Sequence, residues 1–102
     1  FIINEIKALA SYKKLDWQFF YLRTKDDAEI DLIIDRPGMP LCLIEIKSTI
    51  KISTDHTSSF IKFSKDFGSS AEAFVFSQDT ISQKHSHVHC LYWKVGLKEI
   101  GL

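Results

Sequence analysis

Hydrophobic and polar residues alternate along residues 28–48, and this pattern predicts two β-strands joined by a tight turn. In the first strand, residues 28–35, alternation places four apolar side chains on one face: Ala28, Ile30, Leu32 and Ile34. Residues 36–40, with the sequence RPGMP, have the composition of a reverse turn. The second strand, residues 41–48, then runs back beside the first as a hairpin.

This hairpin brings charged side chains face to face. If it is symmetric about Gly38, Asp31 lies opposite Glu45. In the same register, Glu29 lies opposite Lys47. Directly opposed side chains have Cβ atoms about 4.5–5.5 Å apart, and like charges at that separation are destabilising. The two opposed carboxylates therefore need a cation, which is either Lys47 or a divalent metal ion. The alternative interpretation is an exposed ladder of ionic pairs on a solvated face of the sheet.

The rest of the chain predicts the helices and strands that surround this hairpin. They are a helix over residues 1–14, a strand over 17–25, a helix over 56–67, strands over 72–77 and 88–93, and a short helix over 96–100. The unbroken apolar run in residues 72–77 indicates a strand buried on both faces, as in a parallel connection. The order α-β-β-β-α-β-β-α predicts an α/β fold in which helices flank a mixed β-sheet.

Length, charge and cysteines narrow the class of protein. A chain of 102 residues is expected to form a single domain over residues 1–102. Thirteen basic and thirteen acidic residues leave no net charge, so any contact with nucleic acid must be local. Cys42 and Cys90 lie in apolar runs and are expected to be buried free thiols, as in a cytoplasmic protein. No apolar run is long enough to span a membrane.

Asp31, followed after a short hairpin by Glu45-Ile46-Lys47, resembles the D…ExK signature of the PD-(D/E)XK (restriction-endonuclease-like) nuclease superfamily. A longer resemblance, to the uncharacterised C-terminal domain of many prokaryotic P-loop AAA+-type ATPases, covers nearly the whole chain. The segments that carry it include FIINEIKALASY, YLRTKDDAEIDLII, PLCLIEIKS, AFVFS and LYWKVGLKEIGL. The resemblance implies the restriction-endonuclease-like fold, which the predicted order of elements also matches. It further implies that residues 1–102 are the C-terminal fragment of a longer ATPase chain.

The resemblance also implies a catalytic site made of Glu5, Asp31, Glu45 and Lys47. In the superfamily, the carboxylates that match Asp31 and Glu45 bind the metal, with help from the carbonyl that matches Ile46. These residue types suit phosphodiester hydrolysis, because two carboxylates can hold Mg²⁺ or Mn²⁺ and the metal lowers the pKa of a bound water. A lysine can orient that water or stabilise the transition-state charge. The alternative for Glu5 is an acid favoured by the dipole of the first helix.

A second candidate cluster consists of His85, His87 and His89. Alternation predicts that all three lie on one face of a strand, and three histidines can bind zinc. A solvated sheet edge is the preferred interpretation, because the sequence shows no acidic partner for the imidazoles. No GxxxxGK[ST] loop occurs, so this chain is not itself an ATPase.

These patterns predict a metal-dependent nuclease module that uses Mg²⁺ or Mn²⁺ and acts on nucleic acid, DNA foremost. Its second expected partner is the upstream ATPase domain of the same chain, and homo-oligomerisation is left open. The alternative is a non-catalytic module of the same fold that regulates or targets the ATPase. Net neutrality favours this alternative, as does the lack of the extra Gln or Lys that some superfamily members carry on the following helix. Lys51 and Lys62 are weak substitutes.

Overall fold

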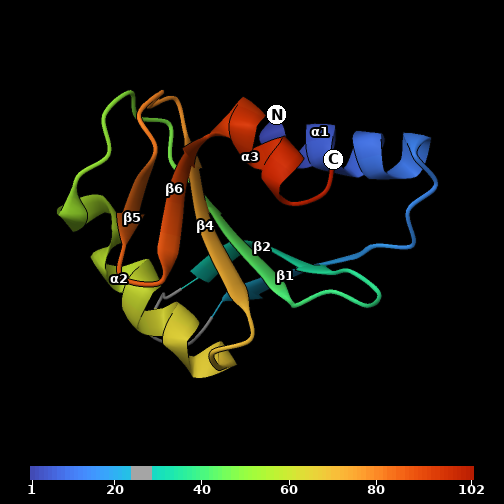
Figure 1. Ribbon diagram of the computed structural model, residues 1–102, viewed down its shortest axis with the longest axis horizontal. Coiled ribbons are helices and arrows are strands. Elements are labelled where there is room, and N and C mark those ends of the chain that lie inside the picture. The colour runs from blue at the N-terminus through green and yellow to red at the C-terminus, as the bar shows by residue number, and fades with distance from the viewer. Residues whose placement is uncertain (24–28) are drawn as a thin grey trace.

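The computed structural model describes residues 1–23 and 29–102. Ala28, and the end of the strand predicted over residues 17–25, lie outside the described residues. The elements in chain order are α1 (Ile2–Tyr12), β1 (Gln18–Arg23), β2 (Glu29–Asp35), β3 (Cys42–Ile46), α2 (Thr54–Ser64), the 3-10 helix η1 (Lys65–Phe67), β4 (Glu72–Ser77), β5 (Gln83–His85), β6 (Val88–Tyr92) and α3 (Trp93–Glu99). Figure 1 shows this chain as one sheet with helices packed on it.

The described strands form one mixed sheet in the order β1-β2-β3-β4-β6-β5. Strands β1, β2 and β3 are antiparallel, whereas β3, β4 and β6 are mutually parallel, and β5 runs antiparallel to β6. The predicted mixed sheet, the order of elements and the parallel connection between β3 and β4 are therefore confirmed. One short strand was not predicted: β5 lies in a polar segment whose composition is that of a loop.

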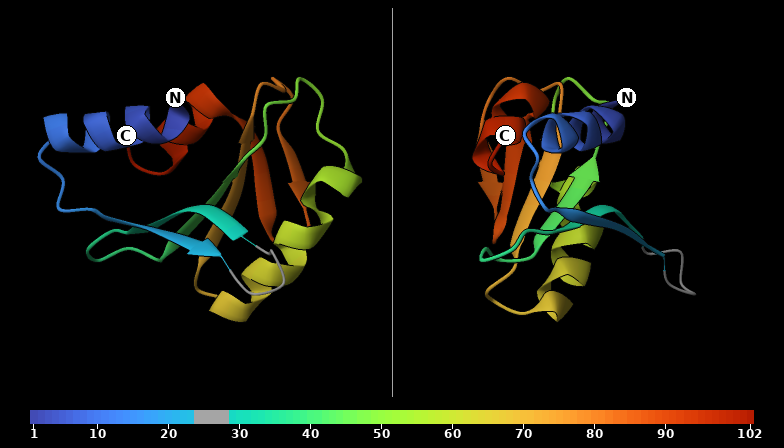
Figure 2. Two further views of the ribbon diagram at one scale, coloured as in Figure 1. Left: turned by 180° about the vertical axis from the view of Figure 1, so that it is seen from behind. Right: turned by 90° about the vertical axis from the view of Figure 1, so that its right-hand side faces the viewer.

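The helices divide between the two faces of the sheet, as Figure 2 shows, with α1 and α3 side by side on one face and α2 on the other. Cys42, Ile44 and Phe76 belong to the core beneath α1 and α3. Leu43 and Val75 belong to the core beneath α2, together with Phe60, Phe63 and Phe67. Alternation along β3 and β4 thus supplies both cores, which is why these central strands read as unbroken apolar runs.

Helix α2 begins and ends at residues whose local chemistry sets its bounds. At its start, Ser53 donates its backbone N–H to Nδ1 of His56 at 2.9 Å, as part of a capping box. At its end, η1 is followed by Gly68 at φ +88°, a backbone conformation that other residues rarely adopt. None of the helices in the described ranges is long and apolar enough to cross a membrane.

Strand β2 carries a β-bulge that overturns part of the predicted alternation. Phe20 pairs with Ile33 and Leu22 pairs with Ile30, so two steps along β1 match three steps along β2. As a result Ile30 packs in the core beneath α2, whereas Leu32 packs in the core beneath α1 and α3. The prediction that Ile30 and Leu32 share one face is wrong, because strict alternation leaves no place for an extra residue.

The turn between β2 and β3 holds a buried arginine that the sequence pattern did not reveal. Arg36 is 1% exposed and donates to the backbone carbonyl of Ile100 at 2.9 Å and to that of Pro40 at 2.8 Å. It also forms an ion pair with Glu72 at the start of β4. Arg36 therefore fastens the hairpin turn to the end of the C-terminal helix, which explains why a charged side chain is tolerated there.

Candidate functional site

The candidate site forms where β2 and β3 separate. The ladder between these strands pairs Leu32 with Ile44, in the register expected for a hairpin symmetric about Gly38. One step further, the carboxylate of Asp31 accepts a hydrogen bond from the backbone N–H of Ile46, with Oδ2 at 2.8 Å from the nitrogen. The bulge at Asp31 thus turns its side chain onto the neighbouring strand, next to Glu45.

Glu45 and Lys47 form an ion pair at the end of β3, with Nζ of Lys47 at 3.7 Å from Oε1 of Glu45. The Glu45 side chain is 16% exposed, and that of Lys47 is 37% exposed. Burial raises the pKa of the Glu45 carboxyl above its ordinary value; Lys47 opposes this rise and the Asp31 charge adds to it. Such a carboxylate, raised in pKa and close to a second one, is a frequent feature of functional sites.

Glu5 lies on the first turn of α1 and is half-buried. Within the described residues it forms no hydrogen bond or ion pair with Asp31, Glu45 or Lys47. The structure therefore brings three of the four predicted side chains together directly. Glu5 stands on the helix that borders this junction, because Phe1 and Ile2 line a pocket of about 250 Å³ together with Ile46 and Lys47.

The donor set at this junction fits a hard divalent cation. The hydrogen bond from Ile46 engages Oδ2 of Asp31 and leaves Oδ1 outside that bond. Across residues 1–23 and 29–102, no three His, Cys, Asp or Glu side chains gather into a metal-binding group. Asp31 and Glu45 are thus a two-carboxylate set, and Mg²⁺ in proteins is commonly held by one or two carboxylates while it keeps several waters.

A pocket of about 290 Å³ adjoins Asp31 on the side of the sheet that α1 covers. Its lining consists of Ile3, Lys7, Phe19, Phe20, Tyr21, Asp31 and Leu32. The bulge explains why both Asp31 and Leu32 reach it, since consecutive residues at a bulge can point to the same side. The aromatic run of β1 was visible in the sequence, but only as a sign of a strand, so its place beside the carboxylates was missed.

The three histidines do not share one strand face, which corrects the predicted cluster. The chain reverses at Ser86, at φ +58°, so His85 ends β5 and His89 lies in β6. Nδ1 of His85 is 2.8 Å from Oγ1 of Thr57, and Nε2 of His87 is 2.6 Å from Oγ of Ser64. His89 instead is exposed, and its ring lies 5.8 Å from that of Phe74, a residue of the core beneath α1 and α3.

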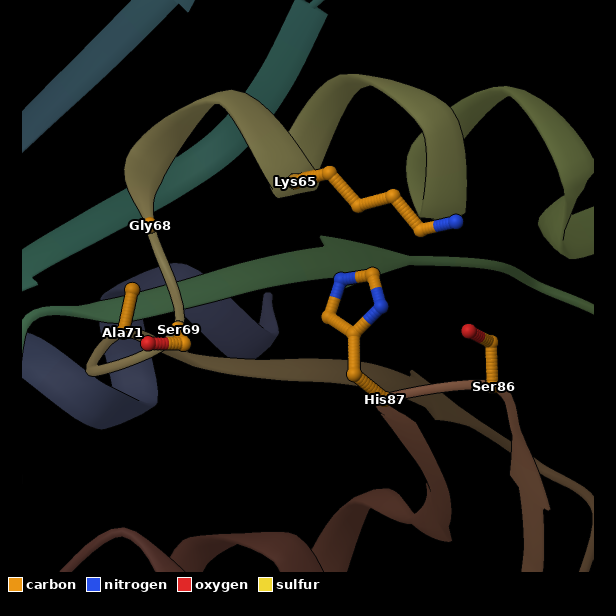
Figure 3. A pocket seen from close by; sticks show the side chains of 6 residues that line it. All are labelled: Lys65, Gly68, Ser69, Ala71, Ser86 and His87. Carbon is orange, nitrogen blue, oxygen red and sulfur yellow. The ribbon is translucent and has the colours of Figure 1, made fainter.

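Figure 3 shows a larger pocket, of about 360 Å³, in which the imidazole of His87 points toward the helical segment that carries Lys65. Burial lowers the pKa of His87 and the nearby Lys65 ammonium lowers it further, which favours the neutral imidazole. This pocket lies where β4 and β6 begin, whereas the carboxylates lie where β3 ends. Since these strands are parallel, the two places are at opposite ends of the sheet.

Comparison with known proteins gives one match. The family described as "Domain of unknown function (DUF4143)" matches residues 1–93. No curated protein and no solved structure matches the chain.

Proposed function

This chain belongs to the DUF4143 family of domains of unknown function, and we propose that it is a phosphodiester-cleaving nuclease module that depends on Mg²⁺ or Mn²⁺. The observation that carries the proposal is the hydrogen bond from Ile46 to Asp31, which holds the carboxylate of β2 against the Glu45-Ile46-Lys47 segment of β3. The D…ExK resemblance gives the same three residues as a catalytic group. An acid pair beside a lysine is the set that metal-assisted hydrolysis requires.

Each residue has a defined role in this proposal. Asp31 and Glu45 would hold the ion, with the Ile46 carbonyl as a further oxygen ligand and Glu5 as a carboxylate supplied from α1. A bound Mg²⁺ or Mn²⁺ would supply a water of lowered pKa and a positive charge to polarise the phosphate. Lys47, whose ammonium lies 3.7 Å from Glu45, orients the attacking water or stabilises negative charge on the phosphoryl oxygens. Half-burial of Glu45 strengthens these charge interactions, because the local dielectric is lower than that of water.

We also propose that the module works as the C-terminal part of a chain that carries a P-loop ATPase. The second candidate function is a non-catalytic module that regulates or targets such an ATPase. One observation favours it: Lys47 and Glu45 already neutralise each other in an ion pair, so the site contains a cation of its own. A measurement of metal binding distinguishes the two candidate functions. A nuclease must exchange the contact between Glu45 and Lys47 for a contact with a metal ion, whereas a regulatory module keeps the ion pair.

The first test measures Mn²⁺ binding by titration calorimetry in wild type, Asp31→Asn and Asp35→Asn. Asparagine can still accept the hydrogen bond from Ile46, so Asp31→Asn removes charge while the local structure is kept. Asp35 is exposed at the other end of β2, and its variant is the matched control. We expect Asp31→Asn to weaken binding roughly tenfold or more, about 1.4 kcal/mol, with no change in Asp35→Asn.

The same proteins are then assayed for cleavage of labelled single-stranded, duplex and branched nucleic acid with Mg²⁺ or Mn²⁺. Lys47→Ala is expected to lose rate with nearly unchanged metal affinity, since its role is on the water or the transition state. Equal Mn²⁺ binding in wild type and Asp31→Asn, together with no cleavage, would replace the nuclease proposal by the regulatory one. Cleavage at full rate in Lys47→Ala would point to a contaminating nuclease.

A further inference from the structure

The pocket beside Asp31 has an aromatic wall that the reaction itself does not require. Phe19, Phe20 and Tyr21 follow one another on β1, an edge strand of the sheet, and all three line this pocket. Phe20 is 50% exposed and Tyr21 is 59% exposed, which is unusual for large rings next to a core. Phe19 packs against the core beneath α1 and α3, whereas Phe20 and Tyr21 need an explanation other than packing within the chain.

Two contacts hold the wall in position. The hydroxyl of Tyr21 donates a hydrogen bond to the carboxylate of Glu29 at 2.8 Å, so the ring is fixed while its surface stays exposed. The ammonium of Lys7, on α1, lies 5.8 Å from the centroid of the Phe19 ring. The pocket thus combines a fixed aromatic surface with one cation. Asp31 lines the same pocket, so its carboxylate is close to both.

This combination matches the way proteins bind single-stranded nucleic acid. Bases stack on aromatic side chains while basic groups follow the phosphates, and the aromatic contact is tolerant of sequence. A chain with no net charge gains little affinity from phosphate neutralisation, so stacking has to contribute more. In a duplex the faces of the bases are already covered by their neighbours, and only an unpaired base can present its face to a ring such as Tyr21.

We propose that the pocket of Lys7, Phe19 and Tyr21 holds an unpaired base next to the scissile phosphate, and that the substrate class is single-stranded nucleic acid. This inference rests on the proposed function for the position of the phosphate, which lies at Asp31 and Glu45. Lys7 contacts the phosphate on the far side of the bound base, and Tyr21 stacks on the base itself. An extended peptide that pairs with the edge of β1 is the competing occupant.

The test measures the fluorescence anisotropy of a labelled oligothymidylate, roughly 12 nucleotides long, in buffer with EDTA. Without metal, binding is read separately from cleavage. Tyr21→Ala is expected to weaken binding roughly tenfold, the effect of losing one stacked base. Tyr21→Phe keeps the stacking surface but loses the hydrogen bond to Glu29, so it should bind more weakly than wild type and more tightly than Tyr21→Ala. Tyr12→Ala removes a tyrosine that is 85% exposed on α1 and outside the pocket lining, and it is the matched control.

The outcomes separate this inference from the proposed function. Asp31→Asn should keep single-strand binding, so loss of metal binding alone leaves the substrate inference standing. Wild type that shows no binding, or Tyr21→Ala that binds as tightly as Tyr12→Ala, would overturn it. A duplex bound as tightly as the single strand would overturn it too, as would an unlabelled β-strand peptide that binds wild type while the oligonucleotide does not.

Discussion

At the scale of single residues, the negative charge of Glu45 at neutral pH lowers the stability of the fold. Its half-buried carboxyl has a raised pKa, so the folded protein holds the proton more tightly than the unfolded chain does. The favourable contribution of the protonated form is complete below the ordinary pKa of 4.5 and is lost as pH rises through the folded-state pKa. At neutral pH the ionised carboxylate therefore lowers the free energy of unfolding, a conflict that is typical of sites retained for function.

We accordingly expect Glu45→Gln to be at least as stable as wild type at pH 7, although it loses the ion pair with Lys47. Burial outweighs that pair in setting the raised pKa, so removing the charge is favourable on balance. The advantage should shrink when the pH falls below 4.5, where wild type is protonated as well. Urea unfolding at several pH values measures this, with Glu99→Gln on α3 as the control for an exposed acid. A Glu45→Gln protein less stable than wild type at pH 7 would contradict the prediction.

At the scale of elements, α3 depends on close approach to the sheet. Gly96 is buried against β4, and a Cβ atom at this position would overlap the ring of Phe76. We expect Gly96→Ala to destabilise the protein by about 1–3 kcal/mol, because the ring or the helix must move to make room. Thermal unfolding measures the change, and Val95→Ala, at an exposed neighbouring position of α3, is the control. Unchanged stability in Gly96→Ala would show that the Phe76 ring has room to rotate away.

Elements also show how far the sequence could be interpreted. The assumption of a turn symmetric about Gly38 correctly predicted the register of the observed pairs, which run from Leu32 with Ile44 to Ile34 with Cys42. The predicted pairs of Asp31 with Glu45 and of Glu29 with Lys47 are not among them. Period-two alternation failed at Asp31, because a bulge depends on the pairing with β1 and is not signalled by any residue type. It failed again at the histidines, where Ser86 adopts a positive φ that is more typical of glycine or asparagine.

At the scale of the whole molecule, the packing of helices on both faces of the sheet was predictable from the sequence. The polar contacts between the helices and the sheet were not. Unbroken apolar strands and amphipathic helices predict a covered mixed sheet, because burial on both faces needs helices on both faces. The candidate site follows only partly from the same patterns. Asp31, Glu45 and Lys47 are close in register, whereas the position of Glu5 and of the aromatic pocket depends on how α1 lies across the sheet.

The buried hydrogen bonds of Arg36 to the carbonyls of Ile100 and Pro40 bear on the order in which the protein folds. Its hydrogen bond to Ile100 joins residues 64 positions apart, so a long loop must close before that contact forms. We expect Arg36→Met to speed unfolding and leave the folding rate nearly unchanged, because the interaction is absent from the transition state. The loss of equilibrium stability should be about 1–3 kcal/mol, since the buried carbonyl of Ile100 is left without its hydrogen-bond donor.

Stopped-flow measurements over a range of denaturant concentrations separate the two rates, and Lys84→Met, exposed on β5, controls for the loss of a positive charge. A slower folding rate in Arg36→Met would contradict the prediction and mean that the C-terminal helix docks early. If only the unfolding rate changes, the contact between Arg36 and Ile100 forms last in folding and breaks first in unfolding, and Arg36 sets the lifetime of the native state.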